Sequence, residues 1–525
     1  FNREYGVYSL LGFSYGSDYE DSAQKALYLY AGDFGPEKEI WFSDDEMNQK
    51  QVEAFRTFVQ SLLKINGLSE EEAADTEQEV TEMMKKMAGE SLSQAEMYDP
   101  QKTYNVYKAS DVEELLGGAV STETLEEIFD VSPDEKMIVS DVGLTESVAS
   151  FLKDENLELL KNYVKVCLYR DLSMYSDTES FEAQQTYSDT INGLEERNPY
   201  EERIFYLVQN DLGFQCGKLF CDEYFQEETK NDIQSMTDQV LTVFENRLSN
   251  MEWMSQETRD EAIKKLKAIE VRIGYPDKWP QDAYELSLKR PEEGGLFVDN
   301  YMEIKKVETE RIFQEKEEPV DKEEWLMYPQ AVNAYYDLST NSISILAGIL
   351  QEPFYDPDAD PEENLGKIGT VIGHEITHAF DSSGAQYDEE GNLRNWWTDE
   401  DLEYFQELAG KVADYYGGME MEGLQINGEQ TVTENIADLG GVSCVLEIAE
   451  QNGYDLKKVM EAWASLWAEK SRPETLSNQI AVDVHSPGKI RVNAVLSSMD
   501  QFYEVYGIEE GDGMYYPPEE RPEIW

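Results

Sequence analysis

The amino-acid sequence predicts a mainly α-helical protein with a smaller β component, an α+β fold in two domains. Three observations lead to this prediction. The chain has 525 residues, which is long for a single hydrophobic core. Its first half repeats apolar residues at helical spacing behind clear helix-start signals. Its second half contains two short strand-like segments separated by turn-forming residues.

The helical first half is predicted from three segments. Ser69 and Glu72 fit a capping box, and an apolar stripe follows at Val80, Met83, Met84 and Met87. A second stripe at helical spacing consists of Ile233, Met236, Val240, Phe244 and Leu248. Ser255 is expected to cap a further helix that runs through Ala268. Stripes of this kind are usually core, and we interpret them as core rather than as ligand sites.

A change in composition near residues 275–300, with several prolines and two adjacent glycines, indicates a domain crossing. We therefore expect a helical domain over residues 1–285 and a second domain over residues 286–525. In the second domain, Val332–Tyr336 and Ser342–Leu346 are predicted strands, and the turn-type residues between them predict a hairpin. From Leu365 the pattern becomes helical again.

The strong acidity of the chain excludes several partners. Asp and Glu number 110 against 43 Lys and Arg, a formal net charge of −67. Such a field repels phosphate backbones and anionic lipid, so we expect no nucleic-acid partner. No apolar run approaches the ~20 residues of a membrane span, so stable membrane insertion is not expected. Because the chain opens with Phe rather than Met, we expect a mature form or a fragment of a longer protein.

The four cysteines show no metal-binding pairs. Cys216 and Cys221 lie five residues apart in a helical-looking run, where their side chains would point apart. We expect free, mostly buried thiols.

Only three histidines occur in the chain, and two of them form the motif from His374 to His378. On a helix, positions i and i+4 face the same side, so both imidazoles can reach one metal ion. Glu375 would lie beside the open coordination position of that metal. The alternative is a pair of surface histidines, but the small, apolar flank at 366–373 predicts a buried helix, where unpaired histidines would be costly.

A catalytic zinc site needs a third protein ligand and an open position for water. Glu434 and Asp438 are also spaced i, i+4 and can face the same site. One carboxylate can bind the metal while the other accepts a hydrogen bond from a ligand imidazole. Taken alone, the segment is equally explained as a polar stripe on an amphipathic helix.

The segments VIGHEITHAFD (371–381) and TENIADLGG (433–441) together resemble the neprilysin and endothelin-converting-enzyme family and its bacterial oligopeptidase branch. The segment 332–336 resembles the substrate-binding edge strand of that family, and 347–351 resembles the stretch that follows the strand. The segment 484–492 and the terminal Ile524-Trp525 resemble its C-terminal end. The resemblance extends through nearly the whole chain, and several ordered motifs together are far more specific than one.

The resemblance implies a thermolysin-like zincin catalytic domain with a large helical cap domain that encloses the active site. It implies one Zn²⁺ per chain, held by His374, His378 and Glu434. Glu375 would be the general base toward metal-activated water, and Asp438 would orient His374.

Further roles implied by the resemblance concern the substrate. His485 would donate to the oxyanion of the tetrahedral intermediate. Arg491 would hold a substrate carbonyl, with Asp483 positioning it, and the alternative for Arg491 is a buried ion pair. Asn333 and Ala334 would pair with the substrate backbone by strand addition.

The chain also departs from the family pattern. Ala379 and Ser382 stand where the family usually has Gly and Asp, which would reshape the loop after the motif. Ser344–Leu346 also differs, which would alter side-chain pockets. The disulfide cysteines of animal members are missing near the C-terminus, which favours a bacterial-type enzyme. An N-terminal portion of the family is expected to be absent.

The sequence therefore predicts a zinc-dependent endopeptidase that hydrolyses oligopeptides. We expect a monomer that works outside a bacterial cell or at its envelope, with the cytoplasm as the alternative. Two rival hypotheses are a non-catalytic binding protein on a peptidase scaffold and a zinc hydrolase of a non-peptide amide. The first would have lost a zinc ligand, and the second would not need Asn333, Ala334 and Arg491 arranged for a peptide backbone.

Overall fold

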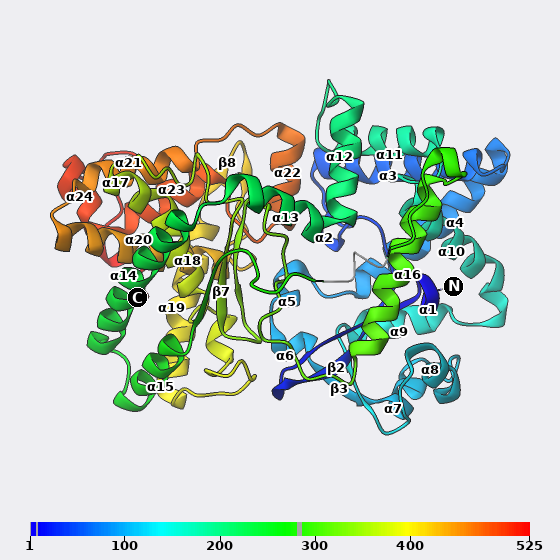
Figure 1. Ribbon diagram of the computed structural model, residues 1–525, viewed down its shortest axis with the longest axis horizontal. Coiled ribbons are helices and arrows are strands. Elements are labelled where there is room, and N and C mark those ends of the chain that lie inside the picture. The colour runs from blue at the N-terminus through cyan, green and yellow to red at the C-terminus, as the bar shows by residue number, and fades with distance from the viewer. Residues whose placement is uncertain (1, 7–8, 281–285) are drawn as a thin grey trace.

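The structure, a computed structural model, describes residues 2–6, 9–280 and 286–525. It consists of two lobes that lie side by side, with the N-terminus in one and the C-terminus in the other (Figure 1). Helices dominate both lobes, and each contains a small sheet. The predicted mainly α fold with a β component is confirmed.

The N-terminal lobe is built from helices around a four-stranded sheet. Its helices are α1 (Asn2–Tyr5), α2 (Lys38–Trp41), α3 (Glu46–Ile65), α4 (Glu70–Glu90), α5 (Gln94–Met97), α6 (Pro100–Thr103), α7 (Ala109–Leu115), α8 (Thr122–Phe129), α9 (Val142–Phe151), α10 (Leu157–Leu172), α11 (Thr178–Ile191), α12 (Tyr200–Asp211), α13 (Gly213–Tyr224) and α16 (Phe297–Glu315). The predicted capping box is present, because Ser69 and Glu72 exchange both bonds at the start of α4.

The sheet of this lobe was not predicted from the sequence. It has the order β1-β2-β4-β3, with β1 (Leu11–Asp18), β2 (Asp21–Ala31), β3 (Asn105–Lys108) and β4 (Lys136–Val139). Strand β2 hides its signal because Ala26–Leu29 is buried on both faces, so hydrophobic and polar residues do not alternate. The turn between β1 and β2 is Tyr19-Glu20, which lacks the glycine or asparagine of a recognisable hairpin turn.

The C-terminal lobe contains the predicted hairpin in a second sheet of order β5-β7-β6. The three strands of this sheet are β5 (Glu270–Gly274), β6 (Ala334–Asp337) and β7 (Ser342–Leu346). The lobe also contains a separate pair of strands, β8 (Glu420–Met421) and β9 (Leu424–Gln425). Its helices are α14 (Glu227–Asn250), α15 (Gln256–Lys267), α17 (Pro361–Asn364), α18 (Thr370–Thr377), α19 (Asp399–Gly417), α20 (Val432–Asn452), α21 (Leu456–Leu466), α22 (Pro473–Val482), α23 (Gly488–Ser498) and α24 (Asp500–Tyr506). Ser255 caps α15 as predicted.

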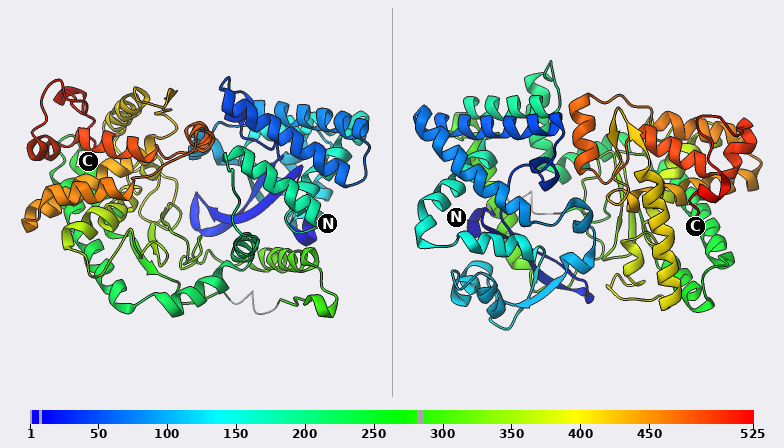
Figure 2. Two further views of the ribbon diagram at one scale, coloured as in Figure 1. Left: turned by 90° about the horizontal axis from the view of Figure 1, so that it is seen from above. Right: turned by 180° about the vertical axis from the view of Figure 1, so that it is seen from behind.

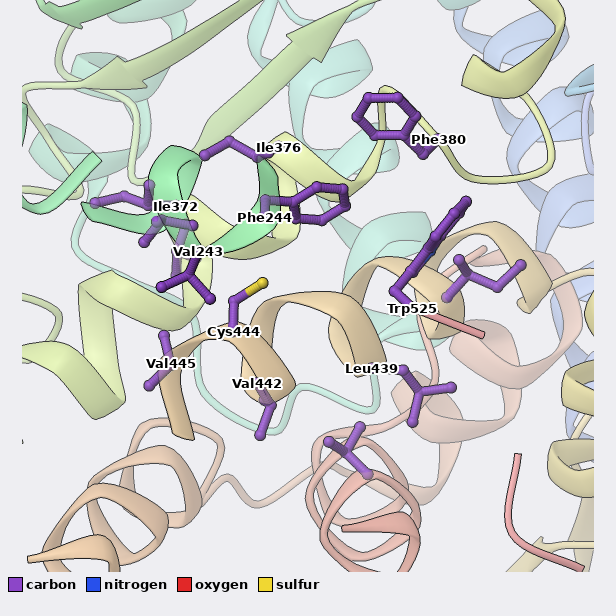
Figure 3. Close-up of a cluster of buried hydrophobic side chains, with 14 of the residues drawn as sticks. Val243, Phe244, Ile372, Ile376, Phe380, Leu439, Val442, Cys444, Val445 and Trp525 are labelled. Atoms are coloured by element: carbon purple, nitrogen blue, oxygen red, sulfur yellow. The ribbon is translucent and has the colours of Figure 1, made fainter. Parts of the chain in front are cut away.

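One large hydrophobic core holds this lobe together (Figure 3). Helices α18 and α20 cross at its centre, and Phe244 from α14 stacks on Phe380. Trp525 at the chain end packs against both rings. The helix that carries the histidine motif is thereby surrounded by packed side chains, which fix its position.

The chain passes between the lobes more than once. The expected domain boundary at residue 285 falls on residues 281–285, which lie outside the described part, and a division there stays a prediction. Helices α14 and α15 and strand β5 precede that point and pack into the core of the C-terminal lobe. Helix α16 follows it and packs beside α1 in the N-terminal lobe.

The lobes touch at several places (Figure 2). Helix α22 packs against α2 and α3, and Ser477 bonds Asp45 at 3.0 Å. On the other side, the tip of the β1–β2 hairpin contacts the loop around residue 392, where Ser22 N donates to the Asn392 carboxamide at 2.8 Å. The α5–α6 segment contacts Ser383 and Gln386 of the same loop, which lie closer in sequence to the histidine motif than Asn392 does.

None of the helices that the structure describes is long and apolar enough to cross a membrane. All four cysteines are free, as predicted, and Cys167, Cys221 and Cys444 are buried.

Candidate active site

The two helices that carry the predicted metal ligands approach each other unusually closely. A Cβ added at Gly373 on α18 would lie 2.7 Å from the Cα of Gly441 on α20. A Cβ at Gly441 would lie 2.6 Å from the backbone nitrogen of His374. Glycine on both sides of the crossing therefore lets the backbones touch, and this contact brings the carboxylates of α20 beside the imidazoles of α18.

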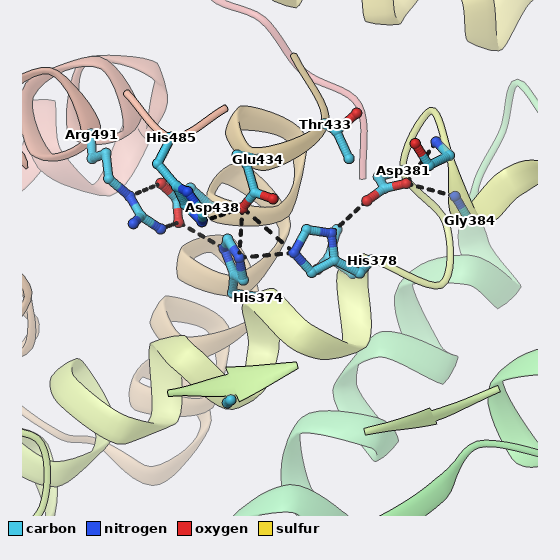
Figure 4. Close-up of polar contacts among 12 residues, drawn as sticks. His374, His378, Asp381, Gly384, Thr433, Glu434, Asp438, His485 and Arg491 are labelled. Atoms are coloured by element: carbon cyan, nitrogen blue, oxygen red, sulfur yellow. Dashed lines mark hydrogen bonds and ion pairs between the residues drawn. The ribbon is translucent and has the colours of Figure 1, made fainter. Parts of the chain in front are cut away.

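Three ligand atoms converge at this crossing (Figure 4). The Nε2 atoms of His374 and His378 lie 2.9 Å apart. They lie 3.1 and 3.6 Å from Oε2 of Glu434. Together the three residues form a metal-type cluster whose ligand atoms all lie within 4.8 Å of one another. The structure thus brings together the three residues that the sequence proposed as ligands.

The hydrogen-bond partners of the imidazoles fit a cation at the centre of this cluster. Nδ1 of His374 lies 2.8 Å from Asp438, and Nδ1 of His378 lies 2.5 Å from Asp381. A carboxylate only accepts, so each Nδ1 must carry the hydrogen, and in the neutral ring Nε2 then holds a lone pair. The buried Oε2 of Glu434 receives no well-formed hydrogen bond among the described residues. Three lone pairs that point at one place, two from nitrogen and one from oxygen, suit zinc.

Asp438 links the site to Arg491. Its carboxylate accepts from His374 and also from Nε and Nη2 of Arg491, at 2.7 and 2.6 Å. Burial opposes ionisation of Asp438, but the guanidinium of Arg491 and the bond from His374 outweigh it and hold its pKa well below the usual range. The planar guanidinium also lies over the ring of Trp467, 3.9 Å from its centroid. Asp438 therefore orients His374 while it is itself held in place by a buried cation.

The predicted contact between Asp483 and Arg491 is wrong. Asp483 instead accepts from the backbone and from Nδ1 of His485, at 2.8 and 2.9 Å. The partner of Arg491 is Asp438, so Arg491 forms the buried ion pair that was the alternative for it. The sequence could not predict this ion pair because Asp438 and Arg491 lie 53 residues apart, and a contact between such distant residues leaves no local sequence pattern. Arg491 still lines the cavity, and its contact with a substrate carbonyl stays a prediction.

His485 lies next to the metal cluster, beside the carboxylate of Glu434. Its Nε2 lies 3.1 Å from Oε2 of Glu434, and its side chain is 43% exposed. Burial disfavours its charged form, but the hydrogen bond with Asp483 and the negative charge of Glu434 raise the pKa of His485 to about 10. An imidazole N–H beside the metal position can donate to an oxyanion.

Glu375 lies in the same cavity and is not part of the ligand cluster. Its side chain is almost fully buried, and burial raises the pKa of its carboxyl despite the opposing charges of His374 and His378. A carboxyl with a raised pKa is suited to accept a proton and return it. The cavity has a volume of about 520 Å³.

The edge of the sheet borders this cavity. Within the part of the chain that the structure describes, strand β6 pairs with β7 alone, so its other edge has no strand partner there. Asn333 and Ala334, at its start, line the cavity, and Asn333 Oδ1 accepts from the Ala334 backbone nitrogen at 3.0 Å. An exposed strand edge beside a catalytic cavity can take an extended peptide as an additional strand.

Sequence reasoning missed three residues near the site. Asp381 orients His378, and its position three residues after that ligand is the sequence signal that could have identified it. Lys265 is buried and donates to the carbonyls of Gly384 and Tyr387, at 2.6 and 2.7 Å, which supports the loop that carries Asp381. Tyr98 alone among the described residues before 332 lines the cavity. No local pattern could assign a residue of the N-terminal lobe to this site.

Comparison with known proteins decides the family. Models of peptidase family M13 match residues 1–276 and 333–521. The chain belongs to peptidase family M13. A neutral endopeptidase of Lactobacillus helveticus is 33% identical over 467 residues, which cover 89% of this chain and 71% of that protein. The predicted resemblance and the predicted metalloendopeptidase class are confirmed.

Solved structures of this M13 family agree with the fold. The zinc metalloprotease ZMP1 of Mycobacterium tuberculosis in complex with inhibitor superposes with a TM-score of 0.92 at 28% identity, covering 100% of this chain and 81% of that one. The same M13 protein in its open state gives a TM-score of only 0.67, with 100% and 83% coverage. The lobes of this chain are therefore arranged as in the inhibitor complex rather than as in the open state.

Proposed function

We propose that this chain is a zinc-dependent endopeptidase that hydrolyses oligopeptides, with Glu375 as general base. The observation that carries the proposal is the convergence of two imidazole nitrogens and one carboxylate oxygen beside a buried, non-ligating carboxylate. His374, His378 and Glu434 would hold one zinc ion. When bound, zinc acts as a Lewis acid that polarises the substrate carbonyl and acidifies water.

The side chains of this chain supply the proton transfers and the orientation. Glu375 takes a proton from the attacking water and delivers it to the leaving amine. His485, held by Asp483, donates from Nε2 to the oxyanion as negative charge develops there. Asp438 and Asp381 keep the two ligand imidazoles in one tautomer and one orientation.

Substrate positioning relies on the free edge of β6 and on Arg491. Asn333 and Ala334 pair with the peptide backbone in extended form. Arg491 commits Nε–H and one Nη2 hydrogen to Asp438, and its Nη1 group, which has no hydrogen-bond partner among the described residues, would hold a substrate carbonyl. Backbone recognition of this kind favours a peptide over another amide.

The enclosed position of the site supports oligopeptides as substrates. The cavity lies between two lobes that touch on opposite sides of it, and Tyr98 of the N-terminal lobe forms part of its wall. A flexible peptide can enter such a space as an extended chain, whereas a folded protein rarely offers an extended segment of sufficient length.

The test compares the zinc-loaded protein with a Glu375→Gln variant on a library of synthetic peptides, with products read by mass spectrometry. We expect one zinc per chain in both proteins by elemental analysis, cleavage by the wild type, and a loss of several orders of magnitude in the variant. Glu403→Gln, on the exposed face of α19, is the matched control and should behave as the wild type.

Two outcomes would contradict the proposal. Absence of a stoichiometric zinc-class metal in freshly purified protein would remove the proposed cofactor. Near-normal turnover by Glu375→Gln would remove the proposed base. A second arm uses a peptide of about ten residues, free or within an exposed loop of a stable folded protein. Equal rates on the two would show that the site is open to folded substrates.

A further inference from the structure

A second cavity adjoins the catalytic one. Its volume is about 540 Å³, and both lobes contribute to its wall. From the N-terminal lobe come residues of the α5–α6 segment, and from the C-terminal lobe come α19 and the loop around residue 395. Three residues line both cavities, namely Tyr98, Ser383 and Thr433. The two cavities therefore share part of their walls rather than lying on separate faces.

The shared wall is held by hydrogen bonds. Ser382 Oγ and Thr433 Oγ1 lie 2.7 Å apart and join the loop after the histidine motif to the start of α20. Ser383 Oγ donates to the backbone carbonyl of Tyr98 at 3.1 Å. Tyr98 is held at its backbone, while 51% of its surface stays exposed toward the open space. A fixed backbone with an exposed ring suits a residue that contacts a passing ligand.

The catalytic cavity is small compared with an oligopeptide. Its volume of about 520 Å³ equals that of a sphere roughly 10 Å across, and an extended chain rises about 3.4 Å per residue. Such a space accommodates about three residues. The remaining residues of a longer substrate lie outside this volume, and the second cavity is a described space that adjoins it.

The lining of the second cavity suits a peptide chain. Trp397 and Phe405 supply an apolar floor, and the Trp397 indole is fixed because its Nε1 donates to the Ala385 carbonyl at 2.9 Å. The carboxamides of Gln101, from the N-terminal lobe, and Gln406, from α19, also line this cavity. A carboxamide both donates and accepts, so it complements the peptide group, and aromatic surface takes apolar side chains.

We propose that this second cavity is the substrate subsite for residues of an oligopeptide beyond those in the catalytic cavity, entered past Tyr98. The inference rests on the proposed peptidase function and adds a substrate class, namely peptides long enough to fill both cavities. Because both lobes form the walls, the subsite exists only while the lobes are together.

The test measures kcat/KM for peptides with one common scissile bond, extended by two to six residues at the N-terminal end in one series and at the C-terminal end in another. For the wild type we expect kcat/KM to rise with length in one series. Ala409→Phe on α19 adds bulk to the cavity wall and should lower the ratio of long-peptide to short-peptide kcat/KM by about tenfold, the size of one lost hydrogen bond.

The matched control is Gly410→Phe, which adds the same ring one residue further along α19. A Cβ at Gly410 meets no atom within 4 Å, and Gly410 does not line the cavity. This variant should keep the wild-type length ratio. If Ala409→Phe does not fold, Gln406→Trp places bulk in the same cavity from an exposed position and should lower the ratio in the same direction.

A kcat/KM that is independent of length in both series would overturn the inference while leaving the peptidase function intact. The same holds if Ala409→Phe or Gln406→Trp leaves the length ratio unchanged. If the zinc-loaded wild type cleaves no peptide of any length, the proposed function itself fails and the inference falls with it.

Discussion

Replacing Asp438 by Asn tests how strongly the metal cluster depends on the buried cation behind it. Asp438 is 2% exposed and accepts three hydrogen bonds, one from His374 and two from Arg491. An amide has one accepting atom. If that atom takes the position of Oδ1, the bonds from His374 and Arg491 Nη2 persist, but an NH₂ group then faces Arg491 Nε–H.

The larger cost is electrostatic. Arg491 is 7% exposed, and the substitution leaves its charge without the carboxylate that neutralises it. Breaking a buried pair in this way costs about 3–5 kcal/mol of unfolding free energy. Loss of the carboxylate behind a ligand imidazole lowers metal affinity by about 10- to 100-fold. Asp438→Asn should therefore weaken both folding and zinc binding.

The assay combines urea titration of the zinc-free protein, followed by tryptophan fluorescence, with zinc competition against a chelator of known affinity. Asp500→Asn is the control, because Asp500 pairs with Arg521 at 2.7 Å but its side chain is 87% exposed. That variant should lose no more than about 1 kcal/mol. If Asp438→Asn loses as little as the control and keeps zinc affinity within about twofold, the buried pair does not support the metal cluster.

Two further predictions concern His485 and Lys265. His485→Ala should lower kcat much more than it raises KM and should retain zinc, because the imidazole stabilises a transition state and is not a ligand. Steady-state kinetics together with elemental analysis measures both effects. Loss of the metal from this variant would contradict the prediction. Complete burial lowers the pKa of Lys265 to about 7, whereas the pKa of a lysine in the unfolded chain is about 10.4. Between those values the unfolded chain binds the proton and the folded chain does not, so wild-type stability relative to Lys265→Met should rise with pH by up to about 1.4 kcal/mol per unit. Urea titrations of both proteins at pH 7, 8 and 9 measure the difference, and a difference that does not change with pH would refute the assignment.

The sequence predicted those parts of the site whose geometry is local. Spacing of i, i+4 on one helix placed His374 with His378 and Glu434 with Asp438, since helical periodicity needs no knowledge of the rest of the fold. The capping box at Ser69 and the cap at Ser255 were predicted for the same reason.

What could not be predicted depends on contacts between distant segments. Arg491 reaches Asp438 only because α23 packs against α20, and Tyr98 reaches the cavity only because the lobes meet. The glycine crossing between α18 and α20 fixes how the two ligand pairs meet, yet Gly373 and Gly441 have no distinguishing pattern of their own. Strand β2 was missed because burial on both faces removes the alternation by which a strand is recognised.

The gathering of all three histidines of a 525-residue chain around one carboxylate oxygen has a practical consequence. Any imidazole resonance in a nuclear magnetic resonance spectrum of this protein originates within the catalytic centre, with no background from elsewhere in the chain. Selective isotope labelling of histidine would therefore turn a 60.3 kDa molecule into a three-signal reporter. Occupancy of the metal position, the tautomer of each ring and the arrival of a ligand would each be read directly from the shifts of those signals.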